Sequence, residues 1–549
     1  MNSMKANNMK FILIIIIGNF SAGISAPIDN YPKNPKIDAI NYIFNIELSD
    51  ETDEIICESK VDVRYLEKGI KELRLDLINV QKGKGMKVSR VTSNGDALTF
   101  KHKNDELYIK LPVPSTVNQR SQYTIFYRGV PAGGFKIADN KYGDRTFFSD
   151  NWPNKARHWL PLIDHPYDKA MCEFVVTAPD HYQVISNGLL IEETDGPNGK
   201  RLTHWKQSVP IAPWLFVLGV AHFAVQYVDT FDGKSIQTWV YEQDRDAGFY
   251  DFAEPTKQVL EFYTDYVGPF AYEKLANIQS NSVGGGMESA TAIFYGDKSV
   301  TGKRSVRWRN VIIHEIAHQW FGNAVTEYDW DDIWLSEGFA TYFTLLFIEH
   351  QYGRDAFVEG LKSSQKRVNA FYKKNPDYTI VHDNLKDMAD VTTGQIYQKG
   401  SWILHMLRGI MGTENFWKGI QSYYAKYQNL NATTDDFRRE MEEASGMDLS
   451  GFFKQWLNGG GTLKYAGTWE YKNGTVKITL DQVQNDGYLF KMPLQIGIYK
   501  PGETTPVIET IQVNKKRNSF TIKVDTEPKK IILDPNLWVL MEAAFEKKK

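Results

Sequence analysis

Cysteine is scarce in this sequence: only Cys57 and Cys172 occur among 549 residues. Their number and spacing do not fit a cysteine-based metal site, and the length of the chain excludes a small disulfide-dependent scaffold. Both lie in apolar, strand-like stretches. Two interpretations therefore remain open, a single disulfide formed after export or two buried free thiols.

The sequence also lacks an excess of charge of one sign. Lys and Arg number 64 against 67 Asp and Glu, for a formal net charge of -3. A chain so nearly neutral has no bulk field to gather nucleic acid or an anionic membrane. No stretch approaches the roughly 20 apolar residues that span a bilayer, so no stable membrane insertion is expected. Internal repeats and low-complexity segments are absent as well.

The one notable apolar run lies at the N-terminus and is short. Lys5 and Lys10 precede the apolar residues 11–17, and small residues follow up to Ala26. This order is typical of a secretory signal peptide, here predicted over residues 1–26. The prediction places the mature protein outside the cell or in a periplasm. The alternative is a buried N-terminal strand.

Hydrophobic periodicity divides the rest of the chain into three domains of a multidomain α+β protein. Residues 27–237 contain short, alternating, β-branched segments and predict a β-rich domain. Residues 238–459 carry apolar residues at helical spacing and predict a mainly helical domain. Strands return in residues 460–549, where Asn473-Gly474 predicts a hairpin turn within a small β-sandwich.

The motif HEIAH lies within one of the helical segments and begins at His314. Residues four apart on a helix differ by about 40° in direction and about 6 Å in rise, so His314 and His318 project from one face and can close on one metal ion. Glu315 points in a neighbouring direction, near enough to reach a water on that metal. The alternative is two histidines that bond only to helix neighbours.

Glu337 strengthens the interpretation as a metal site. It follows His318 after eighteen residues and begins a second amphipathic helix, whose register can bring its carboxylate to the two imidazoles. Two histidines and one glutamate leave the fourth position of a tetrahedral zinc site open for water, which is typical of a catalytic site. The sequence therefore predicts a catalytic zinc site.

Two further segments select among zinc peptidases. Upstream, the glycine stretch that includes Gly285 and Gly286 ends in Met287 and Glu288. Glycines let an extended peptide approach the backbone, and a carboxylate at the end could hold a free α-ammonium group. Downstream, Tyr397 precedes an apolar helix, where its hydroxyl could face the metal. The alternatives are an ordinary turn with a solvated glutamate and a tyrosine used only for packing.

Together these motifs resemble those of the zinc gluzincin aminopeptidases, the metallopeptidase family that includes aminopeptidase N and leukotriene hydrolase. The family markers are G-x-M-E-N, H-E-x-x-H-x18-E and Y-x-K-G, and here they read GGMES, HEIAH with Glu337, and YQKG, in the same order. The resemblance extends from about Tyr42 to the C-terminus. It implies a thermolysin-like catalytic domain between the two β domains, without the large C-terminal helical domain of many relatives.

The resemblance also implies roles for the catalytic residues. One zinc ion would be held by His314, His318 and Glu337. Glu315 would serve as general base and then general acid, and Tyr397 would stabilise the oxyanion. The implied activity is removal of the N-terminal residue from peptides.

The substrate-binding residues implied by the resemblance are Gly285, Gly286, Met287 and Glu288, with Glu288 binding the free amine. Two departures from the family pattern stand beside them: Ser289 replaces the usual Asn, and Trp152 falls where a second amine-binding Glu often lies. The rivals are an endopeptidase or epoxide hydrolase on the same scaffold, or a peptide-binding protein without activity. Retention of every ligand and the base disfavours the last. The sequence makes no prediction of oligomeric state.

Overall fold

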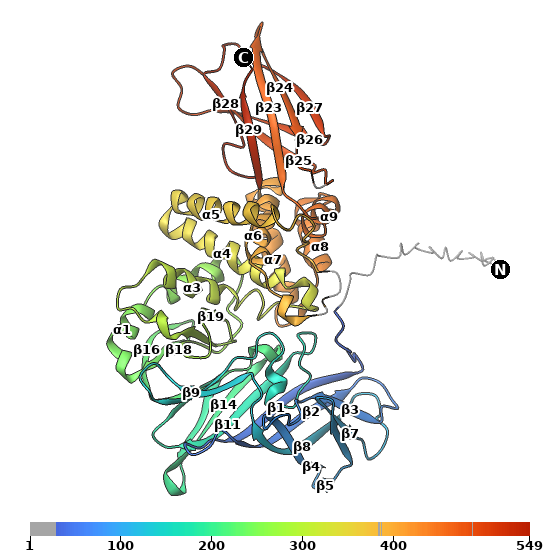
Figure 1. The fold of residues 1–549 in the computed structure, drawn as a ribbon, viewed down its shortest axis with the longest axis vertical. Coiled ribbons are helices and arrows are strands. Elements are labelled where there is room, and N and C mark those ends of the chain that lie inside the picture. The colour runs from blue at the N-terminus through green and yellow to red at the C-terminus, as the bar shows by residue number, and fades with distance from the viewer. Residues whose placement is uncertain (1–28, 383–384, 386, 486, 549) are drawn as a thin grey trace, which may run out of the picture.

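The computed structural model describes residues 29–382, 385, 387–485 and 487–548, and Figure 1 shows three regions stacked along its long axis. A β-rich N-terminal region lies at the blue end, a helical region lies in the middle, and a second β region lies at the red end. This order confirms the predicted multidomain α+β architecture. The predicted signal segment, residues 1–26, lies outside the described residues. Within the described residues, no helix is long and apolar enough to cross a membrane.

Alternating apolar and polar residues build the N-terminal region. In β1 (Ile37–Glu47), buried and partly exposed side chains largely alternate, as expected for a strand with one face on a core. The largest sheet contains, in spatial order, β13 (Leu189–Asp195), β14 (Lys200–Ile211), β11 (Ala170–Pro179), β1, β2 (Ile55–Tyr65), β8 (Gln119–Val130), β4 (Gly85–Ser93) and β5 (Asp96–Ala97). Two smaller sheets contain β12 (Gln183–Ser186), β15 (Leu218–Ala221), β10 (Arg145–Ser149) and β9 (Phe135–Asp139), and β3 (Glu72–Asp76), β7 (Glu106–Lys110) and β6 (Phe100–Lys103).

The two cysteines lie on the strands that flank β1. Cys57 on β2 is paired with Ile46, and Cys172 on β11 is paired with Tyr42. Both are buried free thiols, which decides between the two interpretations of the sequence. Burial raises the pKa of Cys57 to about 12, so this thiol stays protonated and serves as a small apolar side chain.

The sheet of the middle region starts earlier in the chain than the sequence indicated. Its strands are, in order, β16 (Phe223–Phe231), β17 (Lys234–Tyr241), β18 (Lys274–Ser280), β20 (Ala292–Gly296) and β19 (Gly286–Met287). The expected boundary at residue 237 falls within β17, which pairs in parallel with β18. Alternation indicated β strands up to about residue 228, within β16, but it carries no information about which sheet a strand joins, and β17 was not predicted.

The helices of the middle region pack around α4. In chain order they are α1 (Arg245–Phe252), α2 (Thr256–Tyr266), α3 (Val306–Ala317), α4 (Trp334–Tyr352), α5 (Arg354–Tyr372), α6 (Gly394–Met411), α7 (Thr413–Tyr427), α8 (Thr434–Ser445) and α9 (Ser450–Leu457). Fourteen of the 19 residues of α4 are buried, so most of this helix is enclosed by the rest of the protein. Its neighbours α3, α5 and α6 cover it, and α4 is the central element of the helical layer.

The C-terminal region consists of two sheets, as predicted for a small β-sandwich. One contains β27 (Arg517–Lys523), β24 (Thr475–Gln482), β23 (Leu463–Lys472) and β29 (Met541–Lys547), and the other contains β26 (Val507–Val513), β25 (Met492–Tyr499) and β28 (Lys530–Leu533). The predicted hairpin is confirmed: Lys472 pairs with Thr475, and both Asn473 and Gly474 have positive φ. Two central residues with positive φ are typical of a type I′ turn.

Candidate active site

Helix α3 carries the HEIAH motif at its C-terminal end. Ser305 caps the helix by accepting a hydrogen bond from the backbone N–H of Trp308. His314 lies in the last turn and His318 is the C-cap residue, so the helical spacing predicted from the sequence is present. The two Nε2 atoms lie 3.1 Å apart. Both imidazoles therefore face one point.

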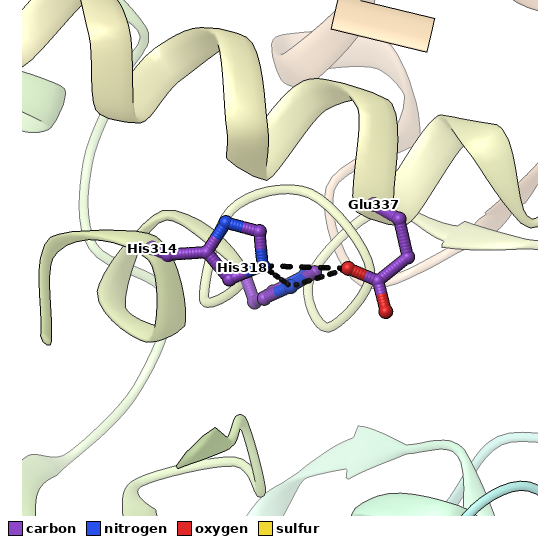
Figure 2. A group of neighbouring side chains, drawn as sticks. All are labelled: His314, His318 and Glu337. Atoms are coloured by element: carbon purple, nitrogen blue, oxygen red, sulfur yellow. Dashed lines mark hydrogen bonds and ion pairs between the residues drawn. The ribbon is translucent and has the colours of Figure 1, made fainter. Parts of the chain in front are cut away.

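Glu337 reaches the same point from the first turn of α4 (Figure 2). Its Oε2 atom lies 3.4 Å from His314 Nε2 and 3.3 Å from His318 Nε2. An ion bound tetrahedrally at about 2.0–2.1 Å from each ligand separates the ligand atoms by about 3.3–3.4 Å. The spacing of these three side chains therefore fits a zinc ion. Within the described chain, Glu337 Oε2 is buried without a hydrogen-bond partner, as a ligand atom would be.

The charges around this point favour a cation. Burial opposes ionisation of Glu337, but the two adjacent imidazoles hold its pKa down at about 2. Burial also disfavours the charged form of His318, yet Glu288, Glu337 and Glu315 together raise its pKa to about 10. Such a concentration of carboxylates would be balanced by a divalent ion.

A second group of ligand atoms, from Glu288, Glu315 and His318, also lies within mutual reach. Its contact between Glu288 and His318 is 4.0 Å long and involves Nδ1 of the histidine. That nitrogen lies 3.1 Å from the carbonyl oxygen of Phe321, to which it donates. The first group, which includes His314 and Glu337, is therefore the better metal site.

Gly286 on β19 packs directly against Glu315. A Cβ atom at position 286 would lie 2.2 Å from Glu315 Oε1, whereas one at Gly285 would meet nothing within 4 Å. The structure thus explains why residue 286 is a glycine: a side chain there would collide with the glutamate of α3. The sequence did not reveal this constraint. Burial, and then the charge of Glu288, raises the pKa of Glu315 well above its usual value.

The carboxylate of Glu288 is buried beside His318 and Glu315. Within the part of the chain that the structure describes, its Oε1 atom has no hydrogen-bond partner. Burial raises the pKa of Glu288 to about 7, against the effect of His318. A buried carboxylate oxygen without a partner is a ready acceptor for a ligand that carries N–H groups and positive charge.

Two residues outside the sequence motifs, Gln319 and Asn323, hold Glu288 in place. Gln319 Nε2 donates to the backbone carbonyl oxygen of Glu288 at 3.0 Å, and Asn323 Nδ2 donates to the same oxygen at 2.7 Å. Gln319 Oε1 also accepts from the backbone N–H of Thr291. Both amides lie just beyond HEIAH in the segment HQWFGN. The available signal in the sequence was the presence of two amide side chains among apolar neighbours.

Tyr397 approaches the site from the first turn of α6. Its hydroxyl donates to Glu337 Oε1 at 2.5 Å, and its ring lies nearly parallel to that of His314 with centroids 6.0 Å apart. The next part of the motif has a packing role: a Cβ atom at Gly400 would lie 3.0 Å from Gly338 Cα. These two glycines allow α6 to cross α4 closely, which brings Tyr397 to Glu337.

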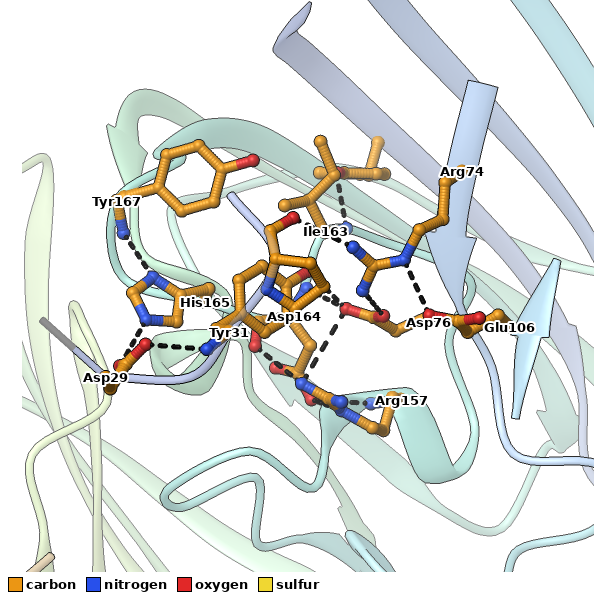
Figure 3. Close-up of polar contacts among 12 residues, drawn as sticks. Asp29, Tyr31, Arg74, Asp76, Glu106, Arg157, Ile163, Asp164, His165 and Tyr167 are labelled. Atoms are coloured by element: carbon orange, nitrogen blue, oxygen red, sulfur yellow. Dashed lines mark hydrogen bonds and ion pairs between the residues drawn. The ribbon is translucent and has the colours of Figure 1, made fainter. Parts of the chain in front are cut away.

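A short segment after residue 28 fixes the chain that leads into α4. Asp29 accepts from His165 Nε2 at 2.7 Å, and Tyr31 stacks on His165 and donates to Asp76 (Figure 3). On the other side, Asp329 Oδ1 accepts from the backbone N–H of Asp29 at 2.9 Å. Asp329 caps the turn η6 (Trp330–Asp332) that precedes α4. The segment therefore joins the N-terminal region to the base of the helix that carries Glu337.

The candidate metal ligands, Glu315, Glu288 and Tyr397 line one cavity of about 300 Å³ between the N-terminal and middle regions. The residues that line it are Trp152, Gly286, Met287, Glu288, Val311, His314, Glu315, His318, Glu337 and Tyr397. Gly285, the remaining predicted substrate-binding residue, does not line the cavity but directly precedes Gly286, which does. Trp152 is contributed by the N-terminal region and packs edge-on against Trp214 and Trp330, with centroids 4.8 and 5.2 Å away. This side of the cavity is thus aromatic, at the position where many members of the family have a second amine-binding glutamate.

Comparison with known proteins agrees with this site. Residues 252–456 match the peptidase family M1 domain, and residues 38–215 match the peptidase M1 N-terminal domain. Human glutamyl aminopeptidase is 31% identical over 322 residues, which cover 56% of this chain and 33% of that protein. Probable aminopeptidase 2 of Sulfurisphaera tokodaii is 27% identical over 470 residues, covering 82% of this chain and 58% of that protein. The match spans about a third of the length of the glutamyl aminopeptidases. Two domain matches in the expected order, around a cavity with the expected residues, show that the chain belongs to peptidase family M1.

Proposed function

We propose that this protein is a zinc-dependent aminopeptidase that hydrolyses the N-terminal peptide bond of peptides, with one zinc ion per chain in a thermolysin-like catalytic domain. The observation that carries the proposal is the arrangement around His318. The Nε2 atom of this residue belongs to the metal-ligand triad, and its Nδ1 atom faces the buried carboxylate of Glu288, whose Oε1 atom has no hydrogen-bond partner among the described residues. The aminopeptidases among its relatives support the same activity.

His314, His318 and Glu337 would hold the metal. Bound there, zinc would polarise the scissile carbonyl and lower the pKa of water. The hydrogen bond from Tyr397 to Glu337, and that from His318 to the Phe321 carbonyl, fix two of the three side chains in their orientation.

Glu315 would act as general base and then as general acid. Its carboxylate is next to the ligand pair on α3 and against Gly286, so it faces the same cavity without joining the triad. Because burial raises its pKa, Glu315 is well suited to accept a proton from water at Oε1 and deliver it to the leaving amine. A glutamate with its usual pKa would release the proton more readily but capture it less well.

Tyr397 would donate a hydrogen bond to the oxyanion. In the structure its hydroxyl donates to Glu337 Oε1, so the proton already points toward the metal site. A short movement of the hydroxyl, from the carboxylate to a substrate oxygen beside it, would make this donor available as negative charge develops.

The free amine of the substrate would bind to Glu288, and the peptide would extend along β19. This strand lies at the edge of its sheet, so its outer backbone groups can pair with an extended peptide. Glu288 lies at one end of the strand and Gly286, against Glu315, lies two residues away. The amine would therefore be held about one residue from the general base, which limits cleavage to the first peptide bond. Trp152 would wall the pocket for the first side chain.

The direct test is hydrolysis of a panel of aminoacyl reporter amides that includes alanyl, leucyl, arginyl and glutamyl forms. We expect release of the reporter by the purified protein, loss of activity with a chelator and recovery with zinc. Metal analysis should find one zinc per chain. Failure to hydrolyse any reporter, with zinc bound, would contradict the proposal.

We also propose that the protein is exported, to the periplasm or outside the cell. The support is the order of basic, apolar and small residues over positions 1–26. Mass spectrometry of the mature protein from its native host should show a new N-terminus near residue 27. Recovery of the intact chain from the cytoplasm would refute export.

A further inference from the structure

A second cavity, of about 500 Å³, lies beside the active site at the same boundary between regions. Most of its lining comes from the N-terminal region, through residues 130–137 and the charged residues Lys84, Asp150 and Lys155. The middle region contributes Ser282, whose hydroxyl donates to the backbone carbonyl of Ser149 at 3.0 Å. The cavity is therefore closed on one side by the segment that leads into β19.

Two chain segments run from this cavity to the active site. One passes from Ser282 to Gly286, and the other passes from Asp150 to Trp152. Four residues of extended chain span at most about 13 Å. Followed backwards along the chain, Glu288 is succeeded by Gly286, which lies beside the proposed general base, and then by Ser282 in the second cavity. A peptide whose amine is on Glu288 would thus direct its leaving portion toward the second cavity.

The cavity has an excess of positive charge. Its acids are already paired: Asp53 with Arg145 at 2.6 Å, and Asp150 with Lys155 at 3.3 Å. Among the described residues, Lys84 and Lys136 have no carboxylate within ion-pair distance, although Lys136 Nζ donates to the backbone carbonyl of Asn281. The cavity therefore offers an anion two ammonium groups, those of Lys84 and Lys136, that are in no ion pair among the described residues.

A polar ring completes the lining. The Nδ1 atom of His158 is buried and makes no hydrogen bond within the described chain. Burial and the adjacent charges of Arg157 and Lys155 lower the pKa of His158, against a backbone contact with Ala132. The ring therefore adds a polar group to a cavity that also contains two lysines able to bind a carboxylate.

We propose that this cavity binds the C-terminal carboxylate of short peptide substrates, through Lys84 and Lys136. The inference rests on the proposed aminopeptidase function and adds a second anchor, which selects peptides by length. The first residue of the peptide would lie between Glu288 and Gly286, and three or four further residues would follow the segment from Gly286 to Ser282, which spans at most about 13 Å. A peptide of about four or five residues would therefore bring its carboxylate to the lysines. Longer peptides would carry their carboxylate beyond the cavity.

The test compares peptides of two to eight residues, each as a free acid and as a C-terminal amide, by kcat/KM. In the wild type we expect the free acid to be favoured by up to roughly twentyfold at four or five residues, because each of the two exposed ion pairs contributes up to about fivefold. At eight residues the ratio should fall to near one.

Two variants locate the effect. Lys84→Glu should remove or invert the preference for the acid, and Lys84→Met should reduce it severalfold. The matched control is Lys87→Met, which removes an exposed lysine three residues further along that does not line the cavity. All variants should hydrolyse an aminoacyl reporter amide at the wild-type rate, since the reporter carries no leaving peptide.

The outcomes separate the two proposals. If the wild type hydrolyses the reporter but the acid-to-amide ratio stays within twofold of one at every length, the carboxylate site is refuted and the aminopeptidase proposal stands. A ratio that is large but unchanged in Lys84→Glu also refutes the site. If the zinc-loaded protein hydrolyses no reporter, the proposed function fails, and the inference fails with it.

Discussion

Gly286→Ala tests how closely β19 is fitted to Glu315, the proposed general base. The added Cβ would lie 2.2 Å from Glu315 Oε1 and 2.3 Å from its Cδ, whereas ordinary contact begins at 3.4 Å. The carboxylate or the strand must therefore move by about 1 Å. A displacement of this size in a catalytic group can lower the rate by about two orders of magnitude. Residue 286 has no positive φ, so backbone strain does not contribute.

The matched control is Gly284→Ala, because a Cβ atom there would meet nothing within 4 Å and its φ is also not positive. We expect kcat on an alanyl reporter amide to fall about 100-fold in Gly286→Ala and less than about threefold in the control. Overpacking should also lower the free energy of unfolding of Gly286→Ala by about 1–3 kcal/mol, with zinc content retained. Activity of Gly286→Ala within threefold of the wild type would refute the argument that Glu315 needs this space.

Three further substitutions probe the remaining groups. Glu315→Gln should lower kcat by about 10²–10⁴-fold and retain one zinc per chain by metal analysis; loss of zinc would make Glu315 a ligand. Tyr397→Phe should lower kcat by about two to three orders of magnitude with little change in KM, and a large rise in KM with kcat intact would instead indicate substrate binding. Asp29→Ala should lower the free energy of unfolding by about 1–3 kcal/mol, measured by urea denaturation, because it leaves the buried His165 without its acceptor and removes one of the two acceptors of Lys33; an unchanged midpoint would show that this segment does not stabilise the protein.

Local periodicity predicted much of the architecture and the centre of the site. The spacing of His314 and His318 follows from helical geometry alone, and the Asn473-Gly474 turn follows from the positive φ that a two-residue hairpin requires. The division between β and helical regions has the same origin. These features depend on residues close together in the chain.

Features that depend on contacts between distant segments were not predictable. Gly286 and Glu315 meet because β19 lies against α3, and Gly338 and Gly400 meet because α4 crosses α6. The sequence shows a glycine at each of these positions but not which residue packs against it. For the same reason, the assignment of β17 to the middle sheet required its pairing with β18.

The lysine-lined cavity shows the same limit more strongly. Nothing in the sequence distinguishes Lys84 and Lys136 from other lysines. Their charge matters only because the acids of the cavity are paired with other cations, Asp53 with Arg145 and Asp150 with Lys155. Trp152 is a mixed case. Its position was predicted to lie near the substrate amine, but its contacts with Trp214 and Trp330 were not.

Recognition of the free amine by Glu288 is the central claim, because the metal ligands, base and tyrosine would serve an endopeptidase equally well. Its most direct test is the ratio of kcat/KM for a free peptide to that for its N-acetyl counterpart, in the wild type and in Glu288→Ala. Loss of a buried charge partner is strongly penalised, so we predict a ratio above about 100 in the wild type, and a large loss of activity on the free peptide in Glu288→Ala with zinc retained. A wild-type ratio near one, or a large ratio that survives Glu288→Ala, would contradict the account.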